Sequence, residues 1–242
     1  MFTTVKIASA VQAQVARFTS RGELVESRRV VLVEDDNLTR LMLSDQLANA
    51  GFSVRTAGRA AEAEAICSDF DPDAVVLDVD LGFGPTGFDL ADSLRLSSPG
   101  IAVLFLTHMP DPRFGGRGAR DLPENIAYLH KNKLADNKSL IRALEAVLRG
   151  NTAGIPRDDR DPKRPLAKLS LNQIDVLRMI ALGLDNQQIA DARKTSIRAV
   201  YSLIGRAMLS IGADDDSEGA ARVVAARAYM LAAGIPFRES TK

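Results

Sequence analysis

The sequence predicts an α/β fold, a doubly wound five-stranded parallel sheet, followed by a small all-α domain. Residues 28–149 alternate short apolar runs with helical patterns, which is typical of a parallel sheet covered by helices on both faces. Residues 167–234 show helical periodicity alone. Residues 150–166 lie between them, are rich in glycine, proline and mixed charge, and predict a linker.

The two terminal segments match neither pattern. Residues 1–27 form an N-terminal extension, where the apolar spacing from Val5 to Phe18 leaves two interpretations open, a weak amphipathic helix or a disordered segment. Gly234 ends the last helical pattern, so residues 235–242 predict a C-terminal tail.

Five apolar runs in the first block predict its strands. Most of them are almost continuously apolar, as expected for strands that are buried on both faces of a sheet. They lie at residues 30–33, 52–56, 74–77, 101–106 and 126–130.

Helical patterns occupy the gaps between these strands. Asp36 is placed to cap the first helix, and Gly51 is placed to end it. Apolar positions mark the other helices of this block at residues 60–70, 90–94 and 140–148.

The second block predicts four helices. The first has an apolar face from Ile174 to Ala181. Asp185 and Gln188 have the spacing of a capping box for a short second helix. Serines at positions 196 and 217 are placed to cap the third and fourth helices.

Bulk composition limits the class of protein. The chain is 46% hydrophobic and 26% charged, and no run approaches the roughly 18 apolar residues that cross a membrane. Cys67 is the only cysteine, which fits a reducing compartment, so we expect a cytoplasmic protein without a membrane partner. Residues 163–213 hold 8 basic and 3 acidic residues, a mild bias that permits a nucleic-acid partner.

Polar residues follow four of the predicted strands. Because ligands of open parallel sheets bind beyond the carboxyl ends of the strands, these side chains are expected to meet at one edge. Asp36 taken alone has a simpler interpretation as a helix cap, but the whole set is hard to explain by capping. The set comprises Glu34, Asp35 and Asp36 after the first strand, Asp78 after the third, Thr107 at the end of the fourth and Lys131 after the fifth.

These residue types predict phosphoryl chemistry at a magnesium ion. Clustered carboxylates raise one another's pKa unless a cation lies among them, and Mg²⁺ prefers oxygen ligands. Asp78 is then placed to attack phosphorus and form an acyl phosphate. Lys131 offsets the charge of the transferring group, and the hydroxyl of Thr107 donates a hydrogen bond to it.

Residues 28–150 resemble the receiver domain of two-component response regulators, whose fold is flavodoxin-like. The resemblance rests on four motifs in order, "VVLVEDD", "AVVLDVDL", "VLFLTH" and "IAYLHK". It implies Mg²⁺ as cofactor, a sensor histidine kinase as phosphoryl donor, and a regulator that is not an enzyme. The site residues that it implies are Glu34, Asp35 and the backbone carbonyl of Asp80 at the metal, Asp78 as metal ligand and phosphoacceptor, Thr107 and Lys131 at the phosphoryl group, and Thr107 with Tyr128 as the switch pair.

The first block departs from the receiver pattern in three places. His108 replaces a small residue and Asn132 replaces a common proline. Residues 107–125, where a receiver has its fourth helix, contain prolines and glycines that oppose a regular helix.

A haloacid-dehalogenase-type phosphatase is an alternative for the first block, because Asp78 and Asp80 also form an Asp-x-Asp motif. In that class the metal-binding acidic pair follows the lysine. Here the acids precede Asp78, and no acidic pair follows Lys131 at a strand end.

Residues 169–212 resemble a LuxR/NarL-type helix-turn-helix, most clearly in "LRMIALGLDNQQIA". The resemblance implies that the third helix enters the major groove of double-stranded DNA. This sequence departs from the family at Tyr201, Leu203 and Ser210, where cationic side chains are usual, and at Arg193, where an apolar one is usual. The candidate DNA-binding residues are Arg193, Lys194, Arg198, Tyr201, Ser202 and Arg206.

Together the two resemblances imply a response regulator that is phosphorylated on Asp78, acts as a homodimer and controls transcription. One alternative remains open. His108, the irregular residues 107–125 and the missing cations of the reading helix also fit a phosphorylation-independent regulator that acts through protein contacts.

Overall fold

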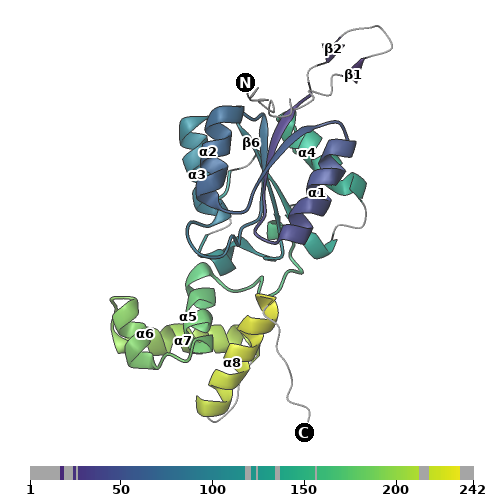
Figure 1. Cartoon of the computed structure of the whole chain (residues 1–242). Coiled ribbons are helices and arrows are strands. Elements are labelled where there is room, and N and C mark those ends of the chain that lie inside the picture. Colours follow the sequence, from purple (N-terminus) through teal and green to yellow (C-terminus); the bar gives the residue numbers. More distant parts are fainter. Residues whose placement is uncertain are drawn as a thin grey trace, which may run out of the picture.

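A computed structural model describes residues 17–18, 24–25, 27–117, 121–123, 125–133, 137–155, 157–212 and 218–234. The predicted fold class is confirmed. A parallel sheet with helices on both faces forms the first block, and a helical domain lies beyond the carboxyl edge of that sheet (Figure 1). In the described parts of the chain, every helix is too short or too polar to cross a bilayer.

The sheet has five parallel strands in the order β4-β3-β5-β6-β7, so the strand that follows β4 in the chain lies on the other side of β3. All five predicted strands are confirmed, with one or both ends shifted by one residue in four of them. They are β3 (Arg29–Val33), β4 (Ser53–Ala57), β5 (Ala74–Leu77), β6 (Ala102–Thr107) and β7 (Ala127–His130).

Two pairs of helices sandwich the sheet. Helices α1 (Asn37–Asn49) and α4 (Asn137–Leu148) cover one face, and α2 (Ala60–Phe70) and α3 (Gly87–Ser97) cover the other (Figure 1). Strand side chains alternate between two apolar cores, one under each pair. This burial on both faces explains why most of the strands are almost continuously apolar, whereas the edge strand β4 contains Ser53, Arg55 and Thr56.

The predicted start of α1 is confirmed, because the side chain of Asp36 accepts a hydrogen bond from the backbone N–H of Thr39. Gly51 follows the end of the helix with a φ of 101°. The lone cysteine, Cys67, is buried in the core under α2 and α3, and burial raises the pKa of its thiol to about 11. Cys67 is therefore a small apolar core residue.

The N-terminal extension is described only in part. A short antiparallel pair joins β1 (Arg17–Phe18) to β2 (Leu24–Val25). The structure thus has a strand at Phe18, the last position of the helical pattern, and the rest of that pattern lies outside the described residues.

Where a receiver has its fourth helix, the described residues form only η1 (Pro112–Gly115), a single turn of 3₁₀-helix. Asp111 caps this turn, and Gly116 ends it in the left-handed region with a φ of 78°. The prolines and glycines that oppose an α-helix therefore have the expected effect. Phe114 points into the core of the C-terminal domain.

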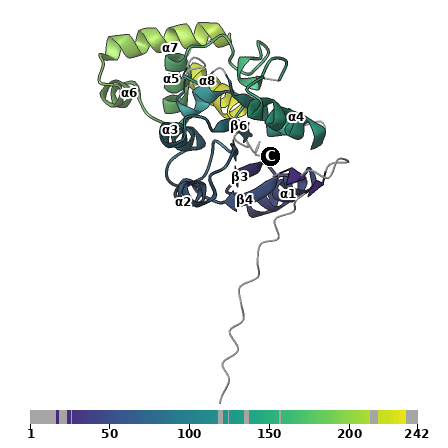
Figure 2. The same ribbon diagram turned by 90° about the horizontal axis from the view of Figure 1, so that it is seen from above.

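Four helices build the C-terminal domain, as predicted: α5 (Leu171–Ala181), α6 (Asn186–Ala192), α7 (Ile197–Ile211) and α8 (Glu218–Ala232). The predicted capping box of Asp185 and Gln188 is confirmed, and Ser196 caps α7. Ser217 lies outside the described residues. In two perpendicular views α7 lies away from the sheet, with α5 nearer to it (Figures 1 and 2).

The segment between the two blocks contacts the sheet. Arg157 pairs with Tyr128 on the outer side of β7, in a single parallel bridge. It is followed by η3 (Asp158–Arg160), where Asp159 is fully buried and paired with Arg157. Asp158 also accepts a hydrogen bond from the backbone N–H of His130. These contacts cover the edge of the sheet that β7 would otherwise expose.

Gly87 allows α3 to begin directly against the end of β5. A Cβ atom at this position would overlap the carbonyl oxygen of Asp78 and lie 2.9 Å from its carbonyl carbon. The backbone N–H of Gly87 donates to the carbonyl of Val79 at 2.9 Å. Glycine is therefore required for the close approach of two backbone segments, one of which carries Asp78.

We predict that Gly87→Ala lowers the free energy of unfolding by about 1–3 kcal/mol, because the new methyl group must displace backbone. Gly205→Ala in α7 is the matched control, since a Cβ there meets nothing within 4 Å. It should raise stability by about 0.5–1 kcal/mol through helix propensity. Urea unfolding of both variants checks this, and equal stability of the two would contradict it.

Candidate functional site

Side chains from three strand ends form a compact charged cluster at the carboxyl edge of the sheet. Glu34 follows β3, Asp78 follows β5, and Lys131 begins η2 (Lys131–Lys133) directly after β7. The ammonium nitrogen of Lys131 lies 2.6 Å from Oε2 of Glu34 and 2.6 Å from Oδ2 of Asp78. One cation therefore bridges the two carboxylates.

The sheet itself positions the two acids. The backbone N–H of Glu34 donates to the carbonyl of Ala57, and that of Asp78 donates to the carbonyl of Val33. Both acids thus continue the ladder of parallel hydrogen bonds by one residue before the chain leaves the sheet. Their side chains start from fixed backbone, which is the usual origin of precise sites in this architecture.

The cluster is largely withdrawn from water. Side-chain exposure is 3% for Glu34, 7% for Asp78 and 10% for Lys131. Burial raises the pKa of Glu34, and the hydrogen bond and charge of Lys131 oppose that rise. Burial by itself would lower the pKa of Lys131, but its attraction to Asp78 and Glu34 outweighs burial and raises it. The lysine therefore stays protonated at neutral pH and compensates the carboxylates.

The acidic groups fit a hard divalent cation. Glu34, Asp35 and Asp78 each offer a carboxylate oxygen, and these oxygens lie within 4.8 Å of one another. Glu34 and Asp78 are buried while Asp35 is exposed, so the set is open to solvent on one side. Such an open set suits Mg²⁺, which retains water or binds phosphate oxygens besides its protein ligands. The backbone N–H of Asp80 donates to Oδ1 of Asp78 at 3.3 Å, so the backbone of Asp80 lies beside this group.

Thr107 and Tyr128 both contact one residue of the next loop, Met109. Thr107 is 1% exposed at the end of β6, and its hydroxyl accepts a hydrogen bond from the backbone N–H of Met109. Tyr128 is fully buried in β7, and its hydroxyl donates to the carbonyl of Met109 at 2.9 Å. Burial raises the pKa of Tyr128, which keeps the phenol protonated as a donor.

The departures His108 and Asn132 lie at the exposed rim of the same edge. The ring of His108 is 6.4 Å from that of His130, and the backbone N–H of Asn132 donates to Nδ1 of His130. Burial lowers the pKa of His130, so its ring is neutral at neutral pH.

Arg40 is a supporting residue that the sequence pattern did not single out. Its guanidinium donates to the backbone carbonyls of Glu34 and Asp35 and to the side chain of Asn37. Those carbonyls lie beyond the last rung of the sheet, so Arg40 satisfies acceptors that the ladder leaves open. The available signal was a lone arginine in the second turn of the helix that follows the acids.

The candidate DNA-binding residues gather around α7, with one exception. Arg193 is the exception, because it forms an ion pair with Asp175 of α5, also contacts Asn172, and keeps 18% side-chain exposure. Lys194 is exposed in the turn before α7, with a φ of 50°. The exposed candidates on α7 are Arg198, Tyr201, Ser202 and Arg206.

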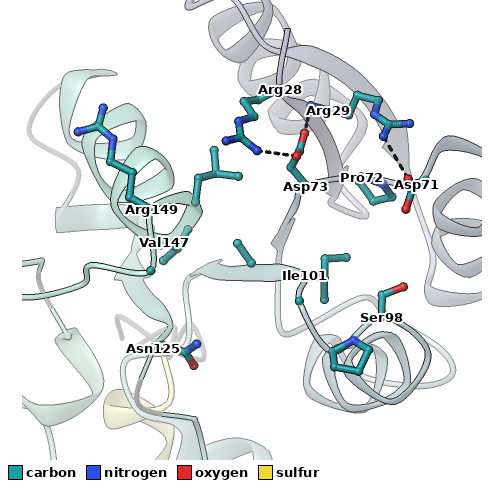
Figure 3. A pocket seen from close by; sticks show the side chains of 15 residues that line it. Arg28, Arg29, Asp71, Pro72, Asp73, Ser98, Ile101, Asn125, Val147 and Arg149 are labelled. Carbon is teal, nitrogen blue, oxygen red and sulfur yellow. Dashed lines mark hydrogen bonds and ion pairs between the residues drawn. The ribbon is translucent and has the colours of Figure 1, made fainter. Parts of the chain in front are cut away.

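A cavity of about 630 Å³ lies at the opposite edge of the sheet, among the residues that precede the strands (Figure 3). Arg28 pairs there with Asp73, and Arg29 pairs with Asp71 (Figure 3). These arginines are already compensated by carboxylates, so the cavity offers less charge to a ligand than the cluster at the carboxyl edge.

Comparison with known proteins gives a consistent result. Residues 30–119 match the family model of the response regulator receiver domain. Oxygen regulatory protein NreC of Staphylococcus aureus (strain MRSA252) is 23% identical over 201 residues, which cover 76% of this chain and 91% of NreC. RcsB of Salmonella enterica serovar Typhimurium, solved bound to promoter rprA in the presence of phosphomimetic BeF3−, has a TM-score of 0.54 at 19% identity. That similarity covers 85% of this chain and 98% of the RcsB chain.

The similarity to RcsB extends over both blocks and supports the two-domain fold. The family match spans the acidic strand ends of β3 and β5 and the end of β6. Residues 30–119 are therefore identified as a response regulator receiver domain, and the similarity to NreC supports a transcriptional regulator in which a C-terminal helix-turn-helix domain follows it.

Proposed function

We propose that this response regulator accepts a phosphoryl group on Asp78 from a sensor histidine kinase and controls transcription by binding double-stranded DNA. The observation that carries the proposal is the buried cluster in which Lys131 contacts both Asp78 and Glu34, with an oxygen of Asp35 nearby. A carboxylate that contacts a lysine ammonium and lies beside two other acidic groups is equipped to bind a metal ion and to act as a nucleophile toward phosphorus.

In the proposed reaction an oxygen of Asp78 attacks the phosphorus of a phosphohistidine on the kinase. The new bond is an acyl phosphate, the phosphorus–nitrogen bond breaks, and the histidine leaves with the electron pair. Mg²⁺ held by Glu34, Asp35, Asp78 and the carbonyl of Asp80 would neutralise the charge of the phosphoryl oxygens. Lys131 is already within hydrogen-bond distance of Asp78 and supplies a second positive charge there.

The added phosphoryl charge is proposed to act on Thr107. In the described state the hydroxyl of Thr107 is engaged by the backbone of Met109. A phosphoryl oxygen on Asp78 would be a charged acceptor for the proton of this hydroxyl, and rotation of Thr107 toward it would weaken the bond that Thr107 accepts from Met109. Tyr128 would respond because it binds the same residue, Met109.

DNA binding is proposed for α7. Its exposed face carries Arg198 and Arg206 with Tyr201 and Ser202, a mixture of cationic and hydrogen-bonding groups. Side chains of this kind contact phosphates and base edges when a helix enters the major groove. RcsB, which shares the fold, was solved bound to a promoter. We further propose a cytoplasmic protein that binds DNA as a homodimer, with one helix-turn-helix domain at each half-site.

A regulator that works through protein contacts without phosphorylation is the second candidate. The observation that favours it is the ion pair of Arg193 with Asp175, which removes one cation from the proposed DNA surface. Gel-shift experiments at low salt separate the two candidates. Promoter binding that is absent in both phosphorylation states would favour protein contacts.

We predict that Asp78→Asn abolishes labelling by acetyl phosphate in the presence of Mg²⁺, because an amide oxygen is a far weaker nucleophile than a carboxylate. Asp80→Asn is the matched control. Its side chain is exposed and its backbone carbonyl is kept, so labelling should persist. Phosphate incorporation measured by intact-protein mass spectrometry checks this, and labelling of Asp78→Asn at the wild-type level would refute Asp78 as acceptor.

We predict that Asp35→Asn weakens Mg²⁺ binding by about tenfold or more, since even the loss of an outer-shell partner commonly costs that much. Asp36→Asn is the matched control, because asparagine still caps α1 and the side chain of Asp36 is turned to Thr39. Isothermal titration calorimetry with MgCl₂ measures both affinities. If the two variants bind Mg²⁺ equally, Asp35 is not a ligand.

We predict that Arg198→Ala weakens promoter binding by about 1–3 kcal/mol or lowers its salt dependence by about one counterion, depending on whether the side chain reads a base or a phosphate. Arg59→Ala removes the same charge from an exposed site at the start of α2 in the receiver domain and should leave binding unchanged. Fluorescence anisotropy across a salt series makes the comparison. An unaltered affinity for Arg198→Ala would remove this residue from the interface.

A further inference from the structure

Residues Met109–Gly116, named here the coupling segment, belong to the receiver domain but take part in both domain cores. Met109 packs against the receiver core under α2 and α3 and also against the core of the C-terminal domain. Phe114 is 8% exposed and lies in the C-terminal core, with its ring 5.6 Å from that of Tyr229 in α8. The two domains are thus joined by apolar packing, in addition to the chain that connects them.

A buried set of charges strengthens this junction. Asp111 is fully buried and binds Arg113, whose Nε lies 2.9 Å from both carboxylate oxygens. Arg164, from the segment before α5, binds the same carboxylate. One carboxylate of the receiver domain therefore holds two guanidinium groups, which gives the junction a fixed geometry as well as charge compensation.

Arg113 also binds the backbone that leads into the C-terminal domain. Its guanidinium donates to the carbonyls of Leu166 and Leu169, just before Ser170 caps α5. Leu166 has a φ of 53°, a conformation that residues other than glycine rarely adopt, so the surroundings must hold it. The side chain of Arg113 is 6% exposed and is the receiver group that makes these bonds. It determines where α5 begins relative to the sheet.

The coupling segment is connected to the proposed switch. Its first residue, Met109, donates its backbone N–H to Thr107 and accepts the hydroxyl of Tyr128 on its carbonyl. A change of partner by either side chain must alter the backbone at Met109. The backbone at Gly115 packs closely on the ring of Phe88, since a Cβ there would lie 3.0 Å from that ring.

Helix α7, the helix proposed to enter the major groove, does not contribute its exposed face to this junction. The coupling segment contacts the C-terminal domain through the start of α5 and through Tyr229 of α8. The outer face of α7 is exposed, including Arg198 and Tyr201. Both views place α7 on the side of the domain away from the sheet (Figures 1 and 2).

We propose that the coupling segment clamps the C-terminal domain to the receiver domain by α5 and α8, so that the receiver controls the orientation of α7 and does not control access to it. Arg113 is the positioning residue of this clamp, and Phe114 is its apolar anchor. The regulatory part of the inference rests on the proposed function, whereas the clamp itself does not depend on phosphorylation.

The test measures the distance between the domains by electron–electron double resonance. Spin labels are attached at Leu96→Cys in α3 and Leu209→Cys in α7, which are 85% and 67% exposed, in a Cys67→Ala background. The unphosphorylated protein should give one narrow distance distribution. Arg113→Met and Phe114→Ala should each broaden it, with helix content by circular dichroism unchanged.

Arg117→Met is the matched control, because Arg117 follows the coupling segment directly but pairs with Asp89 and Asp92 inside the receiver domain. Its distribution should stay narrow. A broad distribution in the unmodified background, or a narrow one in both clamp variants, would overturn the proposal. If Phe114→Ala loses helix content, the distance distribution of Arg113→Met alone tests the clamp, because that variant keeps Phe114.

Two further measurements test the regulatory part of the proposal, the affinity for DNA and the response of the label distance to a phosphoryl mimic. If the receiver covered α7, breaking the clamp would raise the affinity of the unphosphorylated protein for a single DNA half-site by more than about tenfold. We expect Arg113→Met to leave that affinity unchanged within about threefold.

Beryllofluoride with Mg²⁺ should shift the label distance in the clamped protein and not in Arg113→Met. A beryllofluoride shift of equal size in Arg113→Met would overturn the coupling route. If Asp78 does not accept a phosphoryl group, the proposed function is refuted, but the label distances of the unphosphorylated protein still test the clamp.

Discussion

The contact of Lys131 with both Glu34 and Asp78 is the interaction on which the rest of the site depends. Two carboxylates are buried side by side, and burial, followed by repulsion from Asp78 and Asp35, raises the pKa of Glu34. The ammonium group of Lys131 lies 2.6 Å from each carboxylate and opposes the rise in the pKa of Glu34, and the two carboxylates raise the pKa of Lys131. A charged Asp78 is the condition for a nucleophile, and charged oxygens are the condition for Mg²⁺. The proposed phosphoryl chemistry at this edge depends on these charges.

The sheet makes the balance possible, because its parallel strands deliver the three groups from distant parts of the chain to one edge. The same edge carries Thr107, and through Met109 it reaches the coupling segment. The charged cluster and the proposed switch therefore share the carboxyl edge of the sheet, and Met109 connects the switch to the interdomain junction. The segment that follows the receiver domain also contacts this region. Arg157 and Asp159 cover the edge strand β7, and Arg164 binds Asp111.

Much of this arrangement could be predicted because it is encoded locally. Helix α2 begins and ends where the sequence pattern placed it, and the apolar runs identified every strand of the main sheet. The gathering of Glu34, Asp35, Asp78 and Lys131 followed from the rule that parallel strands share a carboxyl edge. What could not be predicted are contacts between segments without a periodic signal. The sequence gives no signal for the burial of Arg113, because its bonds to the carbonyls of Leu166 and Leu169 depend on how the two domains meet. Arg193 looked available for DNA, because its partner Asp175 lies eighteen residues away on another helix.

The interaction at this edge is best tested by fluorine NMR of the full chain with beryllofluoride, whose beryllium binds a carboxylate oxygen and whose fluorines contact a metal ion and a nearby cation. We expect bound fluorine resonances that require Mg²⁺ and are lost in Lys131→Ala and in Asp78→Asn. Bound resonances that persist without Mg²⁺, or their absence from the folded wild-type protein with Mg²⁺, would contradict it.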